Sequence, residues 1–283
     1  MIKFYIPLYY LINTRLKTKM EIFSWNLIFI LPQFLITSYY LNYKLDFFFL
    51  IFFISQLIFH SLYEIGYIEN DIKTVNKEKN PTIRLDKKSF FYVKNNYINI
   101  ISWKYFTITI FLIVLHIINL NQINEIFFYP FIILLIINRL FFYFHNKLRN
   151  RFNIISFFML ATLKYIFPLL LFVDVNTLLY PVLLSVITFP LLRTIEICTL
   201  KRFNFKNFSK KITNLDKFRI LYYLTFSVII IIGWYFSIIN NKNFYITILI
   251  FTYFSLYRIS TYLLIKRGIY KRDVRTNKQY PLK

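Results

Sequence analysis

The chain has 283 residues, of which 58% are hydrophobic and 22% aromatic, and it carries a formal net charge of +23 at pH 7. So apolar a composition excludes an ordinary soluble globular domain and is typical of one membrane domain with several spans. With only three glycines and a single cysteine, Cys198, the sequence also excludes a glycine-rich nucleotide loop, an internal disulfide and a cysteine-based metal site.

The first stretch of the chain, residues 1–13, is apolar, and Arg15, Lys17 and Lys19 follow it. A removed signal peptide would end in small residues at a cleavage site, whereas this stretch runs into bases. We therefore interpret residues 1–20 as an amphipathic segment at the cytoplasmic membrane surface.

Eight later stretches are apolar over about twenty residues, the length that crosses a bilayer. They predict an all-α fold, a polytopic membrane helix bundle that forms a single membrane domain over residues 1–283. The spans are expected at residues 21–41, 46–66, 98–119, 126–143, 154–173, 178–200, 219–239 and 244–265.

Basic residues divide the connections between these spans into two groups. The basic group comprises residues 1–20, 67–97, 144–153, 201–218 and the tail 266–283. The opposite connections hold only Lys44 and Lys242. Because cytoplasmic loops carry the excess of Lys and Arg, we predict an integral membrane protein with both termini in the cytoplasm, placed in the inner membrane if the cell is bacterial. Orientation and attraction to anionic membrane lipids account for the charge, so no nucleic-acid partner is expected.

The connection after the second span gathers acidic residues. Five of the twelve Asp and Glu residues lie within residues 64–86, interleaved with bases. If this stretch is helical, one face carries Asn70, Asp71, Thr74 and Glu78. Asp71 and Glu78 then stand about 10 Å apart along the helix axis, which suits two Mg²⁺ ions that bracket a diphosphate. The alternative is a polar cytoplasmic loop that binds nothing.

Six basic residues lie within or at the ends of the predicted spans, where an ionisable group costs roughly 2.5 to 3.5 kcal/mol. They are Lys104, Arg139, Lys164, Arg193, Arg219 and Arg258. Such groups tend to face the interior of a bundle, so we expect them to meet the acidic connection around a central cavity open to the cytoplasmic side.

The alternative for three of these residues, Lys104, Arg219 and Arg258, is that their long side chains snorkel to the headgroups. Lys164 lies too far inside its span for this and is the strongest candidate for a buried functional cation. Arg193 and Glu196 are three residues apart, a spacing at which they can pair with each other.

The acidic connection resembles the first acidic motif of the UbiA-type intramembrane prenyltransferases. The residues that carry the resemblance are the pair Asn70 and Asp71, the last acid Glu78, and a tail of Asn80, Pro81 and Arg84, with Thr74 in place of the middle acid. The family's second motif follows its sixth helix; here Arg193–Phe203 follows the sixth span, with Glu196, Lys201 and Arg202 in place of paired aspartates. Since the family usually has nine helices, eight to nine are expected.

The resemblance implies an Mg²⁺-dependent membrane transferase. It would move a prenyl group from a polyprenyl diphosphate to an acceptor, or phosphoribose from its diphosphate to a polyprenyl phosphate. The basic loop His145–Arg151 suits the second, more anionic donor. The expected residues are Asp71, Lys164 and Arg193 for catalysis; Asp71, Glu78, Asn70 and Glu196 for Mg²⁺; and Asn70, Asn80, Arg84, Lys77, Arg149 and Lys201 for substrate.

Two other classes stay open. A non-catalytic carrier or flippase for an anionic lipid would use the same bases without metal chemistry, and the missing acid at Thr74 favours it. The retained Asp71 and Glu78 favour the transferase. A structural membrane subunit is the third class, for which these residues would affect assembly and no substrate.

Overall fold

The computed structural model shows a protein made of helices. It describes residues 2–41, 48–74, 84–122, 128–148, 150–200, 203 and 205–269, and every regular element within these ranges is helical, which confirms the predicted all-α class. The elements, with η for 3₁₀ and π segments, are η1 (Ile2–Tyr5), α1 (Tyr9–Arg15), α2 (Lys19–Trp25), η2 (Asn26–Ile30), α3 (Leu31–Tyr39), α4 (Phe48–Glu69), η3 (Asn70–Thr74), α5 (Lys87–Asn95), α6 (Tyr97–Gln122), α7 (Phe128–Lys147), α8 (Asn153–Ile166), α9 (Leu169–Phe172), α10 (Leu179–Val186), η6 (Ile187–Leu191), α11 (Leu192–Cys198), α12 (Lys206–Lys211), α13 (Leu215–Tyr235) and α14 (Asn241–Lys266).

Eight helices in the described ranges are long and apolar enough to cross a membrane, in the order that the sequence predicts. They are Lys19–Tyr39, Phe48–Thr74, Tyr97–Ile118, Phe128–Lys147, Asn153–Phe172, Leu179–Cys198, Leu215–Tyr235 and Asn241–Lys266. The chain is thus a multi-pass membrane helix bundle. The connections contain more helix than predicted, because α5 lies within residues 67–97 and α12 lies within residues 201–218.

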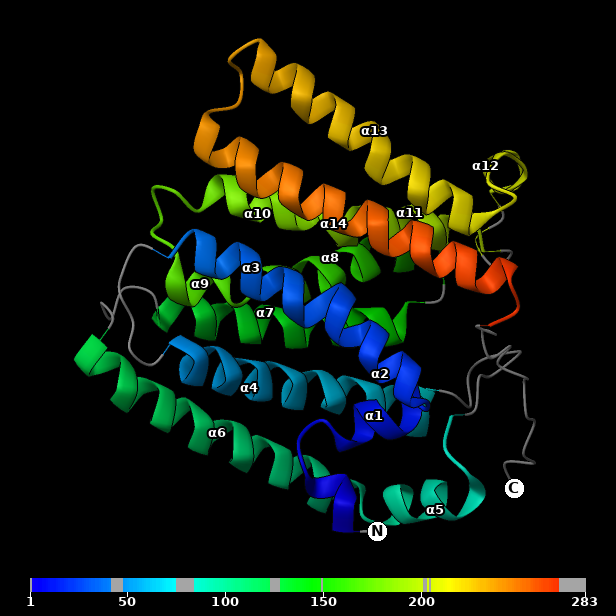
Figure 1. Cartoon of the computed structure of the whole chain (residues 1–283). Helices are drawn as coiled ribbons and strands as arrows, with labels where there is room; N and C mark the ends of the chain where they lie inside the picture. Colours follow the sequence, from blue (N-terminus) through cyan, green and yellow to red (C-terminus); the bar gives the residue numbers. More distant parts are fainter. Residues whose placement is uncertain are drawn as a thin grey trace.

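The spans lie side by side with α4 at the centre of one half (Figure 1). α4 packs against α6 and α7, and α8 packs against α7, α10 and α11. α13 and α14 form a hairpin, and α14 also packs against α3. One end of the bundle carries α1, α5 and α12, and we call it the basic end; the opposite end carries the α9–α10 and α13–α14 turns.

The π segment η2 ends two residues before a proline, Pro32. Pro32 has no N–H to donate to the carbonyl of Ile28, four residues earlier, and in a membrane that carbonyl needs another partner. The Tyr165 hydroxyl, from α8, donates to it. The hydroxyl of Tyr253, from α14, donates to the neighbouring carbonyl of Leu27 at 2.8 Å. Two other spans therefore fix the irregular segment in place.

A second π segment, η6, contains Pro190. Two of its carbonyls again accept hydrogen bonds from tyrosines of another span. Tyr222 donates to Ile187 O at 2.5 Å, and Tyr223 donates to Thr188 O at 2.8 Å. Prolines and π turns interrupt helices at places where side chains of neighbouring helices can satisfy the backbone. Both irregular segments border the pocket described below.

The third proline in this region, Pro168, follows α8 and leaves the carbonyl of Lys164 without its usual donor. The Gln33 side chain of α3 donates to that carbonyl at 2.6 Å. Gln33 is itself held by Gln56 of α4 through a hydrogen bond of 3.0 Å. This chain of amides fixes the backbone from which the Lys164 side chain extends.

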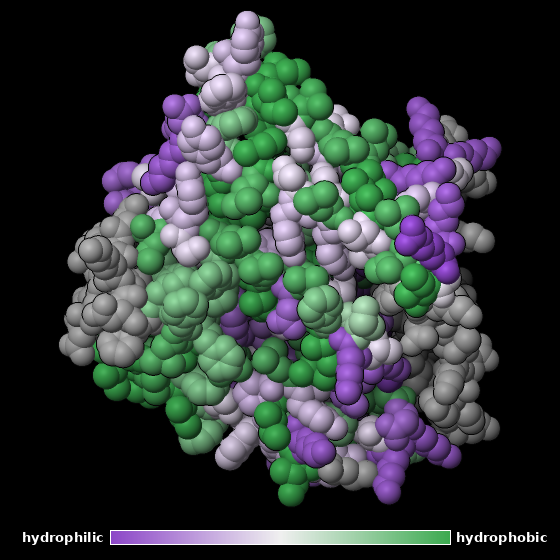
Figure 2. All heavy atoms as spheres, in the orientation of Figure 1, coloured by the Kyte–Doolittle hydropathy of each residue, from purple (hydrophilic) through white to green (hydrophobic). Residues whose placement is uncertain are grey.

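On the face that Figure 2 shows, hydrophobic side chains cover most of the middle, and hydrophilic residues lie mainly toward the two ends of the bundle, including the basic end. The outer spans expose large apolar residues, each at least half exposed. Examples are Phe106 and Ile113 of α6 and Val228 and Ile232 of α13. In water such a surface would be unstable. In a bilayer it faces lipid tails.

Candidate functional site

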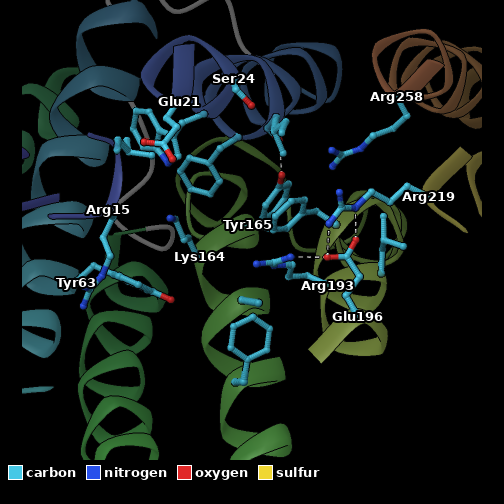
Figure 3. Close-up of a pocket in the computed structure, with 18 of the residues that line it drawn as sticks. Arg15, Glu21, Ser24, Tyr63, Lys164, Tyr165, Arg193, Glu196, Arg219 and Arg258 are labelled. Carbon is cyan, nitrogen blue, oxygen red and sulfur yellow. Dashed lines mark hydrogen bonds and ion pairs between the residues drawn. The ribbon is translucent and has the colours of Figure 1, made fainter. Parts of the chain in front are cut away.

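A pocket of about 510 Å³ opens between the spans near the basic end. Side chains of α1, α2, α4, α8, α11, α13 and α14 and of the two π segments η2 and η6 line it (Figure 3). Its volume lies within the range of about 300 to 1,000 Å³ that small-molecule sites occupy. We call it the central pocket.

Positive charge dominates the described lining of the central pocket. Five different helices each contribute one base, namely Arg15, Lys164, Arg193, Arg219 and Arg258, against two acids, Glu21 and Glu196. Figure 3 shows the labelled bases distributed around the pocket. The rest of the wall is mainly apolar or aromatic. A polar anion with an apolar substituent is the ligand that such a wall fits.

Glu196 is fully engaged by arginines. Arg219 binds it in a bidentate manner, with Nε at 2.5 Å from Oε1 and Nη2 at 3.0 Å from Oε2, and Arg193 also donates to Oε2. The pairing of Arg193 with Glu196 that the spacing predicts is thus confirmed. Arg219 additionally pairs with Asp216 at 2.9 Å. These contacts neutralise the α11–α13 side of the pocket.

Lys164 and Arg258 differ from the other bases, because neither has a carboxylate within ion-pair distance among the described residues. The Lys164 Nζ lies over three aromatic rings, at 4.2 Å from the Phe29 centroid, 5.1 Å from Tyr63 and 5.9 Å from Trp25. Arg258 is 9% exposed, and its Nε has no hydrogen-bond partner. Within the described part of the chain, the pocket therefore holds two bases without a carboxylate as counter-ion.

Asp71 lies apart from the central pocket's lining and is already bonded on both oxygens. Oδ1 accepts from Arg15 and Arg84, both at 3.1 Å, and from Asn70 at 3.3 Å, while Oδ2 accepts from the Tyr10 hydroxyl at 2.9 Å. Burial raises the pKa of the Tyr10 phenol well above its usual value, so this hydroxyl keeps its proton. The α-helix α4 ends at Glu69, and Asp71 lies in the π segment η3 that follows it. The α-helical spacing expected from Asn70 to Thr74 is therefore wrong, because this segment is a π-helix.

These contacts bear on whether Mg²⁺ fits. Asp71 and Glu196 are the two described carboxylates that were expected to bind Mg²⁺, and each is paired with arginines. A cation could bind either carboxylate only by displacing an arginine. Within the described ranges no group of three Asp, Glu, His or Cys residues is close enough to hold a metal ion. The described carboxylates therefore do not fit Mg²⁺, and the excess of bases in the lining favours an anion.

The N-terminal segment is anchored by a buried ion pair. Glu64 of α4 and Lys104 of α6 are each 1% exposed at the side chain and lie 2.6 Å apart. The second oxygen of Glu64 accepts the Leu11 N–H of α1 at 2.7 Å. Residues 2–15 therefore pack against α4 rather than only on the membrane surface, and α1 delivers Arg15 to the pocket rim.

The predicted residues thus separate into groups. Lys164, Arg193 and Glu196 line the central pocket, whereas Asp71, Asn70 and Arg84 lie in the cluster beside it. Of the other intramembrane bases, Lys104 pairs with Glu64 and Arg139 pairs with Glu69, both away from the pocket. The remaining candidates are outside the described residues: Lys77, Glu78, Asn80, Arg149 and Lys201.

Sequence reasoning missed Arg15 as a pocket residue and gave snorkelling as the alternative for Arg219 and Arg258. The prolines at positions 32, 168 and 190 were a usable signal, because interrupted transmembrane helices tend to border cavities.

Comparison with family models, with curated proteins and with solved structures finds no match to this chain. The fold and the pocket define a class: a multi-pass helical membrane protein with a pocket that is lined by basic side chains within the bundle.

Proposed function

We propose that this protein is a transferase that binds a phosphorylated lipid in the central pocket, either a polyprenyl diphosphate as the donor of its prenyl group or a polyprenyl phosphate as the acceptor of phosphoribose. The observation that carries the proposal is the pair of bases, Lys164 and Arg258, within a membrane bundle: neither has a carboxylate partner among the residues that the structure describes. Buried charges are costly unless paired. A ligand that supplies the missing anion is the physical reason to retain them.

The walls of the pocket favour a lipid over a small soluble anion. Apolar side chains such as Ile28, Phe157 and Leu192 line the same cavity as the bases. A headgroup can occupy the charged part while a hydrocarbon chain continues along the apolar wall and out among the spans. Phosphate groups suit arginine and lysine because charge-assisted hydrogen bonds to their oxygens are strong.

Transfer from a diphosphate needs stabilisation of the leaving group. When the bond between the prenyl carbon and the diphosphate oxygen breaks, the electron pair leaves with the diphosphate, and fixed cations stabilise that charge as it develops. The nucleophile of the acceptor then bonds to the prenyl carbon and releases its proton. Lys164 and Arg258 are placed to do this for a prenyl donor. The same bases suit phosphoribosyl diphosphate as donor, with a polyprenyl phosphate as acceptor.

A carrier or flippase for an anionic lipid is the second candidate. It is favoured by the engagement of Asp71 and Glu196 with arginines, since binding and release of a headgroup need no metal ligand. A carrier would use the bases as an intermediate binding site in the membrane.

Turnover separates the two candidates. The purified full chain, in detergent, is offered a polyprenyl diphosphate, or phosphoribosyl diphosphate with a polyprenyl phosphate, and diphosphate release is measured with and without EDTA. The transferase predicts release that falls at least about tenfold in Lys164→Met and is unchanged in Lys94→Gln, an exposed lysine on α5 at the same end.

Movement of labelled lipid across the membrane of proteoliposomes, without diphosphate release, would support the carrier and contradict the transferase. Neither release nor movement, from protein that shows no binding of either lipid, would refute both candidates.

A further inference from the structure

A second pocket, of about 410 Å³, lies next to the central one at the basic end. We call it the outer pocket. α1, the start of α2 and the residues before α5 line it, and its charged side chains are Lys17, Lys19, Arg84 and Asp86. Leu16 lines both pockets, so the two share a wall.

Asp71 connects the bases of the two pockets. Its Oδ1 accepts from Arg15, which lines the central pocket, and from Arg84, which lines the outer pocket, at 3.1 Å each. The Asp71 side chain is only 4% exposed. One buried carboxylate thus holds one arginine from each side, and it competes for both with any anion that enters either pocket.

The outer pocket carries excess positive charge. Lys17 and Lys19 are exposed and have no carboxylate within ion-pair distance among the described residues. Asp86 is the one described acid in the lining. It caps α5 by accepting the Ser89 N–H at 3.2 Å, and the hydrogen bonds from Ser89 lower the pKa of its carboxyl. Because Asp86 is committed to that helix end, the lysines face the pocket without an acid of their own.

Exposed apolar side chains lie beside the lysines at the mouth of the outer pocket. Ile12 belongs to its lining, and Met20 and Phe23, on the same turns of α2 as Lys19, are 52% and 59% exposed. Exposed apolar residues next to lysines mark the membrane interface, where the stems lie among acyl chains and the charges reach the headgroups.

We infer that the outer pocket is a second phosphate-binding subsite, adjoining the central pocket across Asp71. In the proposed function it receives the second phosphorylated participant, or the phosphate-bearing product on its way out. The inference rests on the proposed function for this role, whereas its phosphate chemistry is measured independently of turnover.

The test counts binding sites. Full-length protein in nanodiscs of zwitterionic lipid is titrated with inorganic diphosphate, and calorimetry gives the stoichiometry. The expected result is two diphosphates per chain for the wild type and for the control Lys88→Gln/Lys94→Gln, two exposed lysines of α5. Lys17→Gln/Lys19→Gln, also at exposed positions, is expected to lose one site through an affinity about tenfold or more weaker. Lys164→Met is expected to lose the other site.

The outcomes separate the two proposals. If Lys17→Gln/Lys19→Gln binds diphosphate as the wild type does, the outer subsite does not exist. If the only binding found is abolished by Lys17→Gln/Lys19→Gln and is insensitive to Lys164→Met, the outer subsite stands and the central-pocket function fails.

Two further measurements define the ligand and the role of Asp71. If a lipid headgroup occupies the outer pocket, nanodiscs with anionic phospholipid are expected to abolish diphosphate binding there. If a soluble phosphate occupies it, diphosphate binding is expected to remain. Asp71→Asn, which keeps the size and one acceptor oxygen for Arg15 and Arg84 but removes the competing charge, is expected to tighten diphosphate binding at both sites. Weaker binding at both would show that Asp71 positions Arg15 and Arg84 for the anion, and would overturn its role as a competitor for them.

Discussion

Replacing Lys164 with methionine is expected to weaken binding of a polyprenyl diphosphate by roughly tenfold to a hundredfold and, at the same time, to raise the thermal stability of the protein without ligand. Hydrogen bonds to charged groups contribute about 1.5 to 3 kcal/mol, which sets the loss of affinity. Methionine keeps the apolar stem that packs over Phe29. It removes a partly buried charge that lies within a span and has no carboxylate partner among the described residues, which stabilises the empty fold.

The opposite signs of the two effects distinguish a ligand-binding lysine from a structural one. Binding is measured by titration in detergent and stability by the midpoint of thermal unfolding, with Lys94→Met as the control at the same end. A Lys164→Met protein that is less stable and binds lipid normally would assign Lys164 to packing alone.

The buried pair of Glu64 and Lys104 is expected to give the largest stability effect in the molecule. Lys104→Met leaves the Glu64 carboxylate uncompensated at a side chain exposed by only 1%, and breaking a buried pair in this way costs about 3 to 5 kcal/mol. Glu64→Gln leaves Lys104 in the same position. The double variant removes both charges and is expected to recover most of the loss, because an apolar or neutral replacement of the whole pair is often tolerated.

The measurement is a double-mutant cycle of unfolding free energy in mixed detergent micelles. Strong coupling between the two positions is expected. Additive single effects would mean that the two side chains do not stabilise each other. Since Glu64 also accepts the Leu11 N–H, both single variants are expected to loosen the N-terminal segment and to increase proteolysis near Arg15.

The eight spans were predictable because length and hydropathy are local properties. The pairing of Arg193 with Glu196 was predictable for the same reason, since three residues on one helix determine it. The partners of Asp71 were not: Arg15 is 56 residues away and Arg84 is 13 away, and sequence spacing does not reveal which distant chain segments fold back onto a helix end.

The position of a base along its span can be read from the sequence, but the direction in which its side chain points cannot. Lys104 and Arg258 both fall in the same half of their spans, yet Lys104 meets Glu64 whereas Arg258 faces the pocket without a carboxylate. A hydropathy pattern this uniformly apolar does not define which face of a helix points inward. The amphipathic start of the chain left the same ambiguity, because an apolar face can pack on lipid or, as Tyr10 and Leu11 do, on protein.

The most direct test of the central claim is a cryo-electron microscopy structure of the protein in nanodiscs that contain a polyprenyl diphosphate. The account predicts phosphate density in the central pocket, with oxygens about 3 Å from the Lys164 ammonium and from the Arg258 guanidinium and the hydrocarbon chain along the apolar wall. A headgroup bound elsewhere, or a central pocket in which carboxylates of the chain itself pair with both bases, would contradict it.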